Sequence, residues 1–329
     1  MRAIFYTFVA LGGISTNMDV LISVALILVG IALVIWGADK LTAGAVGVAA
    51  KLGVPQMVIG LTIVAMGTSA PELFVSLMSA IKDSPDLAVG NIVGSNIFNA
   101  LTIVGLSAIV VPIGIATKTI KVDLPITVAA GLLLLVLSLD GDISRIDAAI
   151  LFVCFIAFLA YTLYDAKKEG ADAEDEAGDP LSTVKSVLYI VLGLAGLVFG
   201  SDLFVDGATG AARIIGISDA VIGLTIVAAG TSLPELATSI VAARKGNSAI
   251  AIGNVIGSNI FNILLILGVT GLISPMHIAG VGAVDMGVMA ASGLLMWLFC
   301  ATKHEVERWE GAVMVAVYVG YVAYLIYNI

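Results

Sequence analysis

The segment "VIGLTIVAMGTSAPELFVSLMSAIKDSPDLAVGNIVGSNIFN" at residues 58–99 returns as "VIGLTIVAAGTSLPELATSIVAARKGNSAIAIGNVIGSNIFN" at residues 221–262. The two copies align without a gap at a constant offset of 163, and 26 of their 42 positions are identical. Upstream the match continues weakly, as "WGADK" at 36–40 and "FGSDL" at 199–203. A repeat of this length predicts a chain built from two copies of one structural unit.

The composition around these segments is that of a membrane protein. Of the 329 residues, 60% are hydrophobic and 12% are charged, whereas soluble domains carry about 25% charged residues. Ten apolar runs are long enough to cross a hydrocarbon core, and only helices satisfy their own backbone groups there. We expect spans near residues 19–37, 43–67, 88–111, 122–139, 146–164, 184–200, 207–231, 251–273, 283–301 and 311–328.

Five spans per repeat imply that the second copy enters the membrane from the opposite side, because an odd number of crossings reverses the chain. The predicted fold is an all-α integral membrane protein of ten transmembrane helices, arranged as two inverted five-helix repeats with broken core helices. The predicted boundaries are 18–164 for the first repeat, 165–182 for an acidic linker and 183–329 for the second repeat. The first 17 residues are expected to be interfacial, or to precede a start at Met18.

The basic residues predict an orientation. When loops are assigned alternately, eleven of the fifteen Lys and Arg residues fall on one side, which is then cytoplasmic. This puts the linker in the cytoplasm and both termini outside, and the expected location is the plasma (inner) membrane. The linker lacks the spacing of a calcium-binding hand, so a solvated connection is favoured over a regulatory loop.

The motifs "GTSAPE" at 67–72 and "GTSLPE" at 230–235 place a proline and a carboxylate within apolar spans. Proline lacks an N–H and its ring clashes with the carbonyl four residues earlier, so each helix should kink or unwind. The freed carbonyls would join the hydroxyls of Thr68, Ser69, Thr231 and Ser232 and the carboxylates of Glu72 and Glu235. Such oxygen-only sets suit sodium, calcium or magnesium.

The motifs "GNIVGSNIFN" at 90–99 and "GNVIGSNIFN" at 253–262 add a second polar group. Their glycines are spaced for close helix packing. Asn91, Ser95 and Asn99 fall on one helical face, as do their counterparts Asn254, Ser258 and Asn262. Asn96 and Asn259 point away from those faces and are expected to bond to neighbouring helices. Asp39 and Asp202 are expected to cap helices or bond loops, with ion entry as the alternative.

These paired motifs closely resemble the two alpha-repeats of the sodium/calcium exchanger family. The specific match covers about 84 residues, and the five-plus-five layout extends it over most of the chain. The resemblance implies a central core made by the second, third, seventh and eighth helices, with helices one and six sliding across it.

Carried over by position, the resemblance implies Glu72 and Glu235 as calcium ligands, aided by backbone carbonyls near Ala65 and Ala228. It implies a mainly sodium-binding role for Thr68, Ser69, Ser95, Thr231, Ser232 and Ser258, with Asn99 and Asn262 at the centre. Many members carry an acidic residue where this chain has Asn262. Its absence predicts exchange that does not require potassium.

The expected function is therefore an antiporter that exchanges sodium for calcium by alternating access, with both ions competing for one site. A calcium/proton antiporter on the same fold is the near alternative, and a cation channel is a more distant one. An enzyme is disfavoured, because HExxH is absent and His277 and His304 lie near span ends. The expected partners are sodium and calcium ions and the lipid bilayer, without nucleic acid, cofactor or obligatory oligomer.

Overall fold

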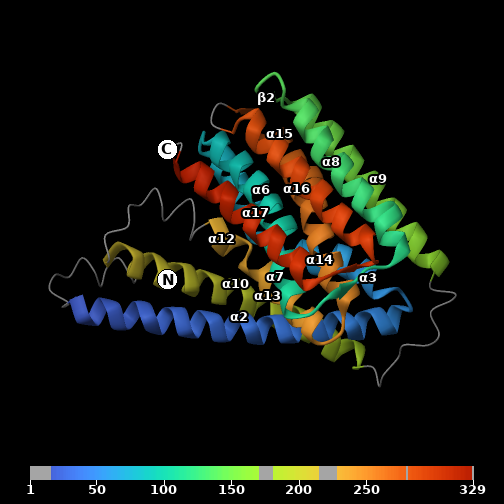
Figure 1. The fold of residues 1–329 in the computed structure, drawn as a ribbon, viewed down its shortest axis with the longest axis horizontal. Helices are drawn as coiled ribbons and strands as arrows, with labels where there is room; N and C mark the ends of the chain where they lie inside the picture. The colour runs from blue at the N-terminus through green and yellow to red at the C-terminus, as the bar shows by residue number, and fades with distance from the viewer. Residues whose placement is uncertain (1–15, 170–180, 215–227, 279–280, 328–329) are drawn as a thin grey trace.

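The computed structural model describes residues 16–169, 181–214, 228–278 and 281–327, and this part of the chain is almost entirely helical (Figure 1). The first half comprises α2 (Thr16–Leu52), α3 (Gln56–Ile59), η1 (Gly60–Val64), α4 (Ala65–Thr68), α5 (Ala70–Ile81), α6 (Pro85–Phe98), η2 (Asn99–Ile103), α7 (Val104–Val110), β1 (Ile113–Gly114), η3 (Thr119–Asp123), α8 (Leu124–Leu137), β2 (Asp142–Ile143) and α9 (Arg145–Glu169). The second half comprises α10 (Thr183–Ile214), α12 (Ala228–Thr231), α13 (Leu233–Arg244), α14 (Ser248–Ile260), η5 (Phe261–Leu267), α15 (Gly268–Ile273), β3 (Met276–His277), α16 (Ala283–Thr302), β4 (Glu305–Val306) and α17 (Arg308–Tyr327). The η segments are π-helical turns.

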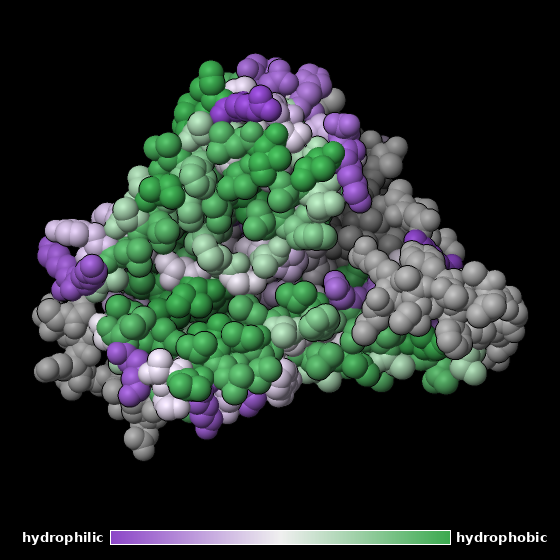
Figure 2. All heavy atoms as spheres, turned by 180° about the vertical axis from the view of Figure 1, so that it is seen from behind, coloured by the Kyte–Doolittle hydropathy of each residue, from purple (hydrophilic) through white to green (hydrophobic). Residues whose placement is uncertain are grey.

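The protein is an all-helical membrane protein with two repeats. Seven described helices are long and apolar enough to cross a membrane, and the bent pair Gln56–Thr68 and Ala70–Ile81 brings the number to eight. The other two predicted spans correspond to α17 and to α12–α13, and much of the segment before α12 lies outside the described residues. Figure 2 shows apolar residues across most of the coloured part of one face, with hydrophilic residues mainly along its top, left and bottom edges.

The predicted boundary between the first two spans is wrong. Helix α2 runs without interruption for 37 residues, through the gap expected at residues 38–42. Asp39 and Lys40 occupy that gap, but the surrounding Ala, Leu and Gly residues include no proline, so nothing ends the helix. Asp39 therefore lies inside α2, and Asp202 lies inside α10, so neither caps a helix.

Helices α2 and α10 form an antiparallel pair that is steeply inclined to α8 and α9 (Figure 1). A straight α2 is about 55 Å long, so it must tilt to fit a core of about 30 Å. Glycines let the two backbones touch: a Cβ at Gly200 would lie 2.8 Å from the Val34 nitrogen and 2.9 Å from the Gly30 oxygen. These glycines recur at Gly30, Gly37 and Gly44 and, at the repeat offset, at Gly193, Gly200 and Gly207.

Two short antiparallel ribbons show that the repeats are inverted. β1 pairs with β4, and β2 pairs with β3. The partners Ile113 and Val306 become Met276 and Ile143 when each is moved by one repeat, and these two are also partners. β1 and β2 flank the 19-residue segment Thr119–Leu137, which is about 28 Å long. The ribbons therefore lie at opposite ends of α8, and α16 runs antiparallel to α8 beside it.

The core consists of the two repeat-related segments that contain the GNxxGSNIFN motifs. Of the most apolar stretch of Pro85–Val110, 83% is buried, and for Ser248–Ile273 the figure is 94%. A Cβ at Gly257 would lie 2.6 Å from the Leu61 oxygen, which confirms the predicted close packing for the second copy. The equivalent neighbours of Gly90 and Gly94 lie largely outside the described residues.

We expect Gly200→Leu to lower the free energy of unfolding by about 1–3 kcal/mol, because its neighbours are backbone atoms that cannot move aside. The matched control is Gly320→Leu in α17, where a Cβ meets no atom within 4 Å in the described part of the chain. Thermal unfolding in detergent micelles would compare the two. Equal melting temperatures for both variants would contradict the packing assigned to α2 and α10.

Candidate ion-binding site

The predicted break in the second span is present. Helix α4 ends at Thr68 and α5 begins at Ala70, with an angle of 46° between the two arms. Ser69 joins them with φ −81° and ψ 7°, and Ser232 has the same conformation with φ −88° and ψ 8°. This sparsely populated backbone region is common at functional sites. Pro71 follows the break and cannot donate to the Gly67 carbonyl, which supplies the physical reason for it.

Glu72 and Glu235 lie just after the two breaks, each in the first turn of its helix and each 1% exposed. Each is bonded by the serine of the opposite repeat: Ser232 Oγ donates to Glu72 Oε1 at 3.2 Å, and Ser69 Oγ donates to Glu235 Oε1 at 3.0 Å. The partial positive charge of a helix N-terminus favours a carboxylate in this position. The two acids therefore share one interface between the repeats.

Four buried oxygens at this interface have no hydrogen-bond donor among the described residues. They are the remaining oxygens of two repeat-related pairs: Glu72 Oε2, Glu235 Oε2, Asn99 Oδ1 and Asn262 Oδ1. Burying an acceptor without a partner is costly, and more so for a charged one. Four such oxygens, two from carboxyl groups and two from amides, are ligands that a hard cation prefers.

A frame of asparagines orients the two central amides. Asn99 Nδ2 donates to Asn259 Oδ1 at 3.1 Å, and Asn262 Nδ2 donates to Asn96 Oδ1 at 3.0 Å. Asn96 Nδ2 in turn donates to the Asn259 carbonyl at 3.2 Å. The prediction that Asn96 and Asn259 bond to neighbouring helices is confirmed. Asn99 and Asn262 use their amide nitrogens in these bonds, and their amide oxygens have no donor among the described residues.

Asn91 and Asn254 lie on the predicted polar faces but are engaged in positioning the broken helices. Asn254 Nδ2 donates to the Glu235 carbonyl at 3.2 Å and to Ser239 Oγ at 3.0 Å. Asn91 makes the same two bonds to Glu72 and Ser76. Sequence reasoning missed both serines. Ser76 and Ser239 occupy equivalent positions in the two repeats, and this recurrence could have identified them.

The other predicted residues lie close around this centre where the structure describes them. Thr68 Oγ1 donates to Asn254 Oδ1 at 3.0 Å, and Ser258 Oγ donates to Glu235 Oε1 at 3.4 Å. The Ala65 carbonyl accepts the Ser69 amide at 2.9 Å, so it is already bonded within the helix. Ser95 is buried and Thr231 is half-buried. Ala228 begins α12, and its side chain lies outside the described set.

The described residues contain no group of three or more His, Cys, Asp or Glu side chains placed so that they could hold a metal ion together. No Lys or Arg lies within ion-pair distance of Glu72 or Glu235 in the same part of the chain. The charge of the site is therefore that of two carboxyl groups.

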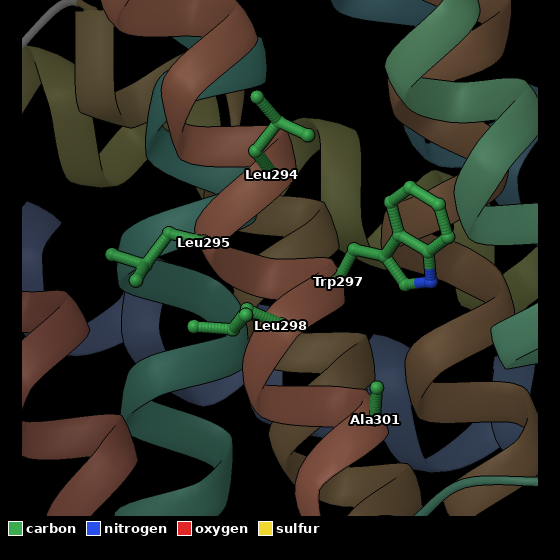
Figure 3. A pocket seen from close by; sticks show the side chains of 5 residues that line it. All are labelled: Leu294, Leu295, Trp297, Leu298 and Ala301. Carbon is green, nitrogen blue, oxygen red and sulfur yellow. The ribbon is translucent and has the colours of Figure 1, made fainter.

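An apolar hollow lies elsewhere, along α16 (Figure 3). It measures about 470 Å³ and is lined by Leu294, Leu295, Trp297, Leu298 and Ala301. The Trp297 indole donates to the Ile120 carbonyl at 2.8 Å, which uses the polar atom of the largest side chain in this lining. Without a charged or carboxylate group, this hollow suits lipid chains and not ions.

Comparisons with known proteins identify chains of similar sequence and fold. A model of the family described as "Sodium/calcium exchanger protein" matches residues 22–164 and 185–327. CaxA from Alkalimonas amylolytica is 41% identical over 94% of this chain and 99% of its own length. Sodium/calcium exchanger MaX1 from Methanosarcina acetivorans is 34% identical over 92% of this chain and 98% of its own. The sodium-calcium exchanger NCX_Mj, soaked with sodium and strontium, superposes with a TM-score of 0.81 at 35% identity, covering 92% of this chain and 98% of that one.

We expect Asn254→Ala to lower the free energy of unfolding by about 1–3 kcal/mol, because the Glu235 carbonyl and two side-chain partners lose buried hydrogen bonds. The matched control is Asn91→Ala, since Asn91 has the same two donor bonds but is only half-buried. Its loss should be smaller. A larger loss at Asn91, measured by thermal unfolding in detergent, would contradict the assigned roles.

Proposed function

Because this chain belongs to the sodium/calcium exchanger family, whose members are transporters and not enzymes, we propose that it exchanges sodium for calcium across its membrane. As a cation/calcium exchanger of the NCX_Mj fold, it needs a binding centre that both ions can use. The observation that supports this centre is the set of four buried oxygens on Glu72, Glu235, Asn99 and Asn262 that lack a donor among the described residues.

In the proposed site, Glu72 and Glu235 bind calcium, with Asn99 and Asn262 completing the centre. The hydroxyls of Thr68, Ser69, Ser95, Thr231, Ser232 and Ser258 and the carbonyls near Ala65 and Ala228 provide the surrounding oxygens. The Ala65 carbonyl would bind an ion in addition to the amide bond it already accepts. Every side chain proposed here is neutral except the two glutamates, so the site has two negative charges.

This charge explains how the two ions are coupled. One calcium ion neutralises both carboxylates, so a loaded site can be enclosed in a medium of low dielectric constant at less cost than a charged one. Sodium ions that bind the same carboxylates compete with calcium. A transporter whose closed forms require a neutralised site therefore carries calcium one way and sodium the other.

Access would alternate through movement of the α2–α10 pair over the core. The backbones of the pair touch through glycines along its length, whereas its contacts with the broken helices are fewer: α2 packs along α13, and α10 contacts α4, α12 and α13. These features fit a unit that moves as a body. We assign residues 18–164 and 183–329 to the two repeats and 165–182 to a cytoplasmic linker, with both termini outside the plasma (inner) membrane.

A calcium/proton antiporter is the second candidate. Glu72 and Glu235 lack a basic partner within ion-pair distance in the described residues, so each could carry a proton in place of a sodium ion. The hydroxyl groups around them favour sodium, because a proton needs no such shell.

Calcium uptake into sodium-loaded proteoliposomes distinguishes the two candidates. We expect uptake to require an outward sodium gradient at equal pH, and to persist when choline replaces potassium on both sides, because Asn262 adds no third negative charge. Uptake driven by a proton gradient without sodium would favour the alternative. Activity that is lost in choline and restored by potassium would show that the charge assignment is wrong.

We expect Glu72→Gln and Glu235→Gln each to reduce exchange by about 100-fold or more, since one carboxylate cannot neutralise a calcium ion taken from water. Glu307→Gln is a matched control, because Glu307 lies outside the core and pairs with Lys303 at 2.8 Å. It should exchange at close to the normal rate. If either core variant keeps near-normal flux, that residue does not belong to the site.

A further inference from the structure

The two repeats are nearly symmetric in sequence but not in their contacts with the α2–α10 pair. Helix α2 packs along α13, whereas α10 does not pack along α5, the repeat counterpart of α13. One pair of equivalent residues shows the difference: Ile250 is 0% exposed beneath α2, and its counterpart Leu87 is 60% exposed. Among the described residues, the core is thus covered by α2 on the side of Ile250, and α10 does not cover it in the same way on the side of Leu87.

Small apolar side chains make the covered side. Residues of α2 meet the end of α13 and the start of α14 in one buried cluster, which includes Ala38, Leu41, Ala45, Ala49, Ala242, Ala243, Ile250 and Ala251. By the predicted topology this side faces the cytoplasm. The structure is then closed towards the cytoplasm.

An ion pair spans the edge of this cluster. Lys245 follows the last residue of α13, and its Nζ lies 2.5 Å from Asp39 Oδ1 in the middle of α2. The same Nζ donates to the Asp39 carbonyl at 3.3 Å. Lys40 is also near Asp39, at 3.7 Å, but it belongs to the same helix and joins nothing to the core. The Asp39–Lys245 pair is therefore a charged link between the moving pair and a broken helix.

Both members of this ion pair recur at the repeat offset. Asp39 corresponds to Asp202, although little else matches in that region, and Lys245 corresponds to Lys82. Lys82 follows α5 as Lys245 follows α13. In the described residues Lys82 has no carboxylate within 4.0 Å. The chain thus carries two equivalent pairs, and the conformation described has brought one of them together.

We propose that Asp39 and Lys245 hold the α2–α10 pair in the conformation closed on the side of Ile250, and that Asp202 and Lys82 hold the oppositely closed conformation. This inference rests on the proposed exchange only in assuming that both conformations are visited. Helix α13 has 12 residues, with Glu235 in its first turn and Lys245 just beyond its end. One short helix therefore joins the binding site to the ion pair.

Accessibility of single cysteines tests this proposal in the full chain with Cys154 and Cys300 replaced by alanine. Ala242→Cys reports on the covered side, and Leu87→Cys reports on the uncovered side. The pair is partly exposed, at 45% for Asp39 and 36% for Lys245, so a modest effect is expected. Asp39→Asn should raise the rate at which a water-soluble maleimide labels residue 242 about two- to five-fold, and lower the rate at residue 87.

Asp202→Asn should shift the two rates in the opposite directions, because it removes the pair that holds the other conformation. The matched control is Lys40→Gln, which removes a charge beside Asp39 without breaking a link to the core. Exchanging the charges, with Asp39→Lys and Lys245→Asp together, should restore the original rates. Restoration also excludes simple unfolding of the Asp39→Asn variant.

The proposal is overturned if the Asp39→Asn and Lys40→Gln variants have the same labelling rates at residues 242 and 87. It is also overturned if Asp202→Asn shifts both rates in the same directions as Asp39→Asn. These rates are measured without any ion gradient. If labelling shifts as expected but no sodium-driven calcium flux occurs, the proposed function fails and the ion pairs stand. If sodium-driven calcium flux occurs and the labelling rates do not shift, the proposed role of the ion pairs is wrong and the proposed function is retained.

Discussion

Two carboxyl groups buried at the middle of a membrane protein constrain everything around them. Glu72 and Glu235 are almost inaccessible to water, and charges in such surroundings are tolerated only when neighbouring groups compensate for lost hydration. The compensation comes from both repeats at once: a serine of the opposite repeat and the first turn of a broken helix serve each acid. The second oxygen of each acid has no hydrogen-bond donor among the described residues, which suits a cation or a proton.

The sequence predicted that these residues lie together, because the signals for the two breaks are local. A proline next to a carboxylate in an apolar run predicts a break wherever it occurs, at Pro71 and again at Pro234, and the five spans of each repeat predicted the inverted architecture. The error at α2 arose because Asp39 and Lys40 resemble a loop when viewed alone. In the folded chain the Asp39 carboxylate pairs with Lys245, which is distant in sequence and near only after folding. A prediction from neighbouring residues fails where a residue distant in the sequence changes the free-energy cost of placing a charged side chain in a helix.

The asparagine frame shows a second limit. The spacing of the motif placed Asn99 and Asn262 on the polar faces, but which amide oxygen is left unbonded depends on the pairing of Asn96 with Asn262 and of Asn259 with Asn99. Those pairings connect residues in different repeats, so no window of sequence contains them. The π-helical turns η2 and η5, which begin at Asn99 and one residue before Asn262, also depend on tertiary packing and are not signalled by composition.

The two ribbons and the asparagine frame have a consequence for the origin of such a molecule. Each ribbon takes one strand from each repeat, and each of the two amide pairs takes one residue from each repeat, so these contacts join a unit to an inverted copy of itself. None of these contacts needs the covalent link between the halves. A chain half as long, inserted into a bilayer in both orientations, would satisfy the same pairings as an antiparallel homodimer. Fusion of two such genes then fixes the stoichiometry and allows the halves to diverge one residue at a time.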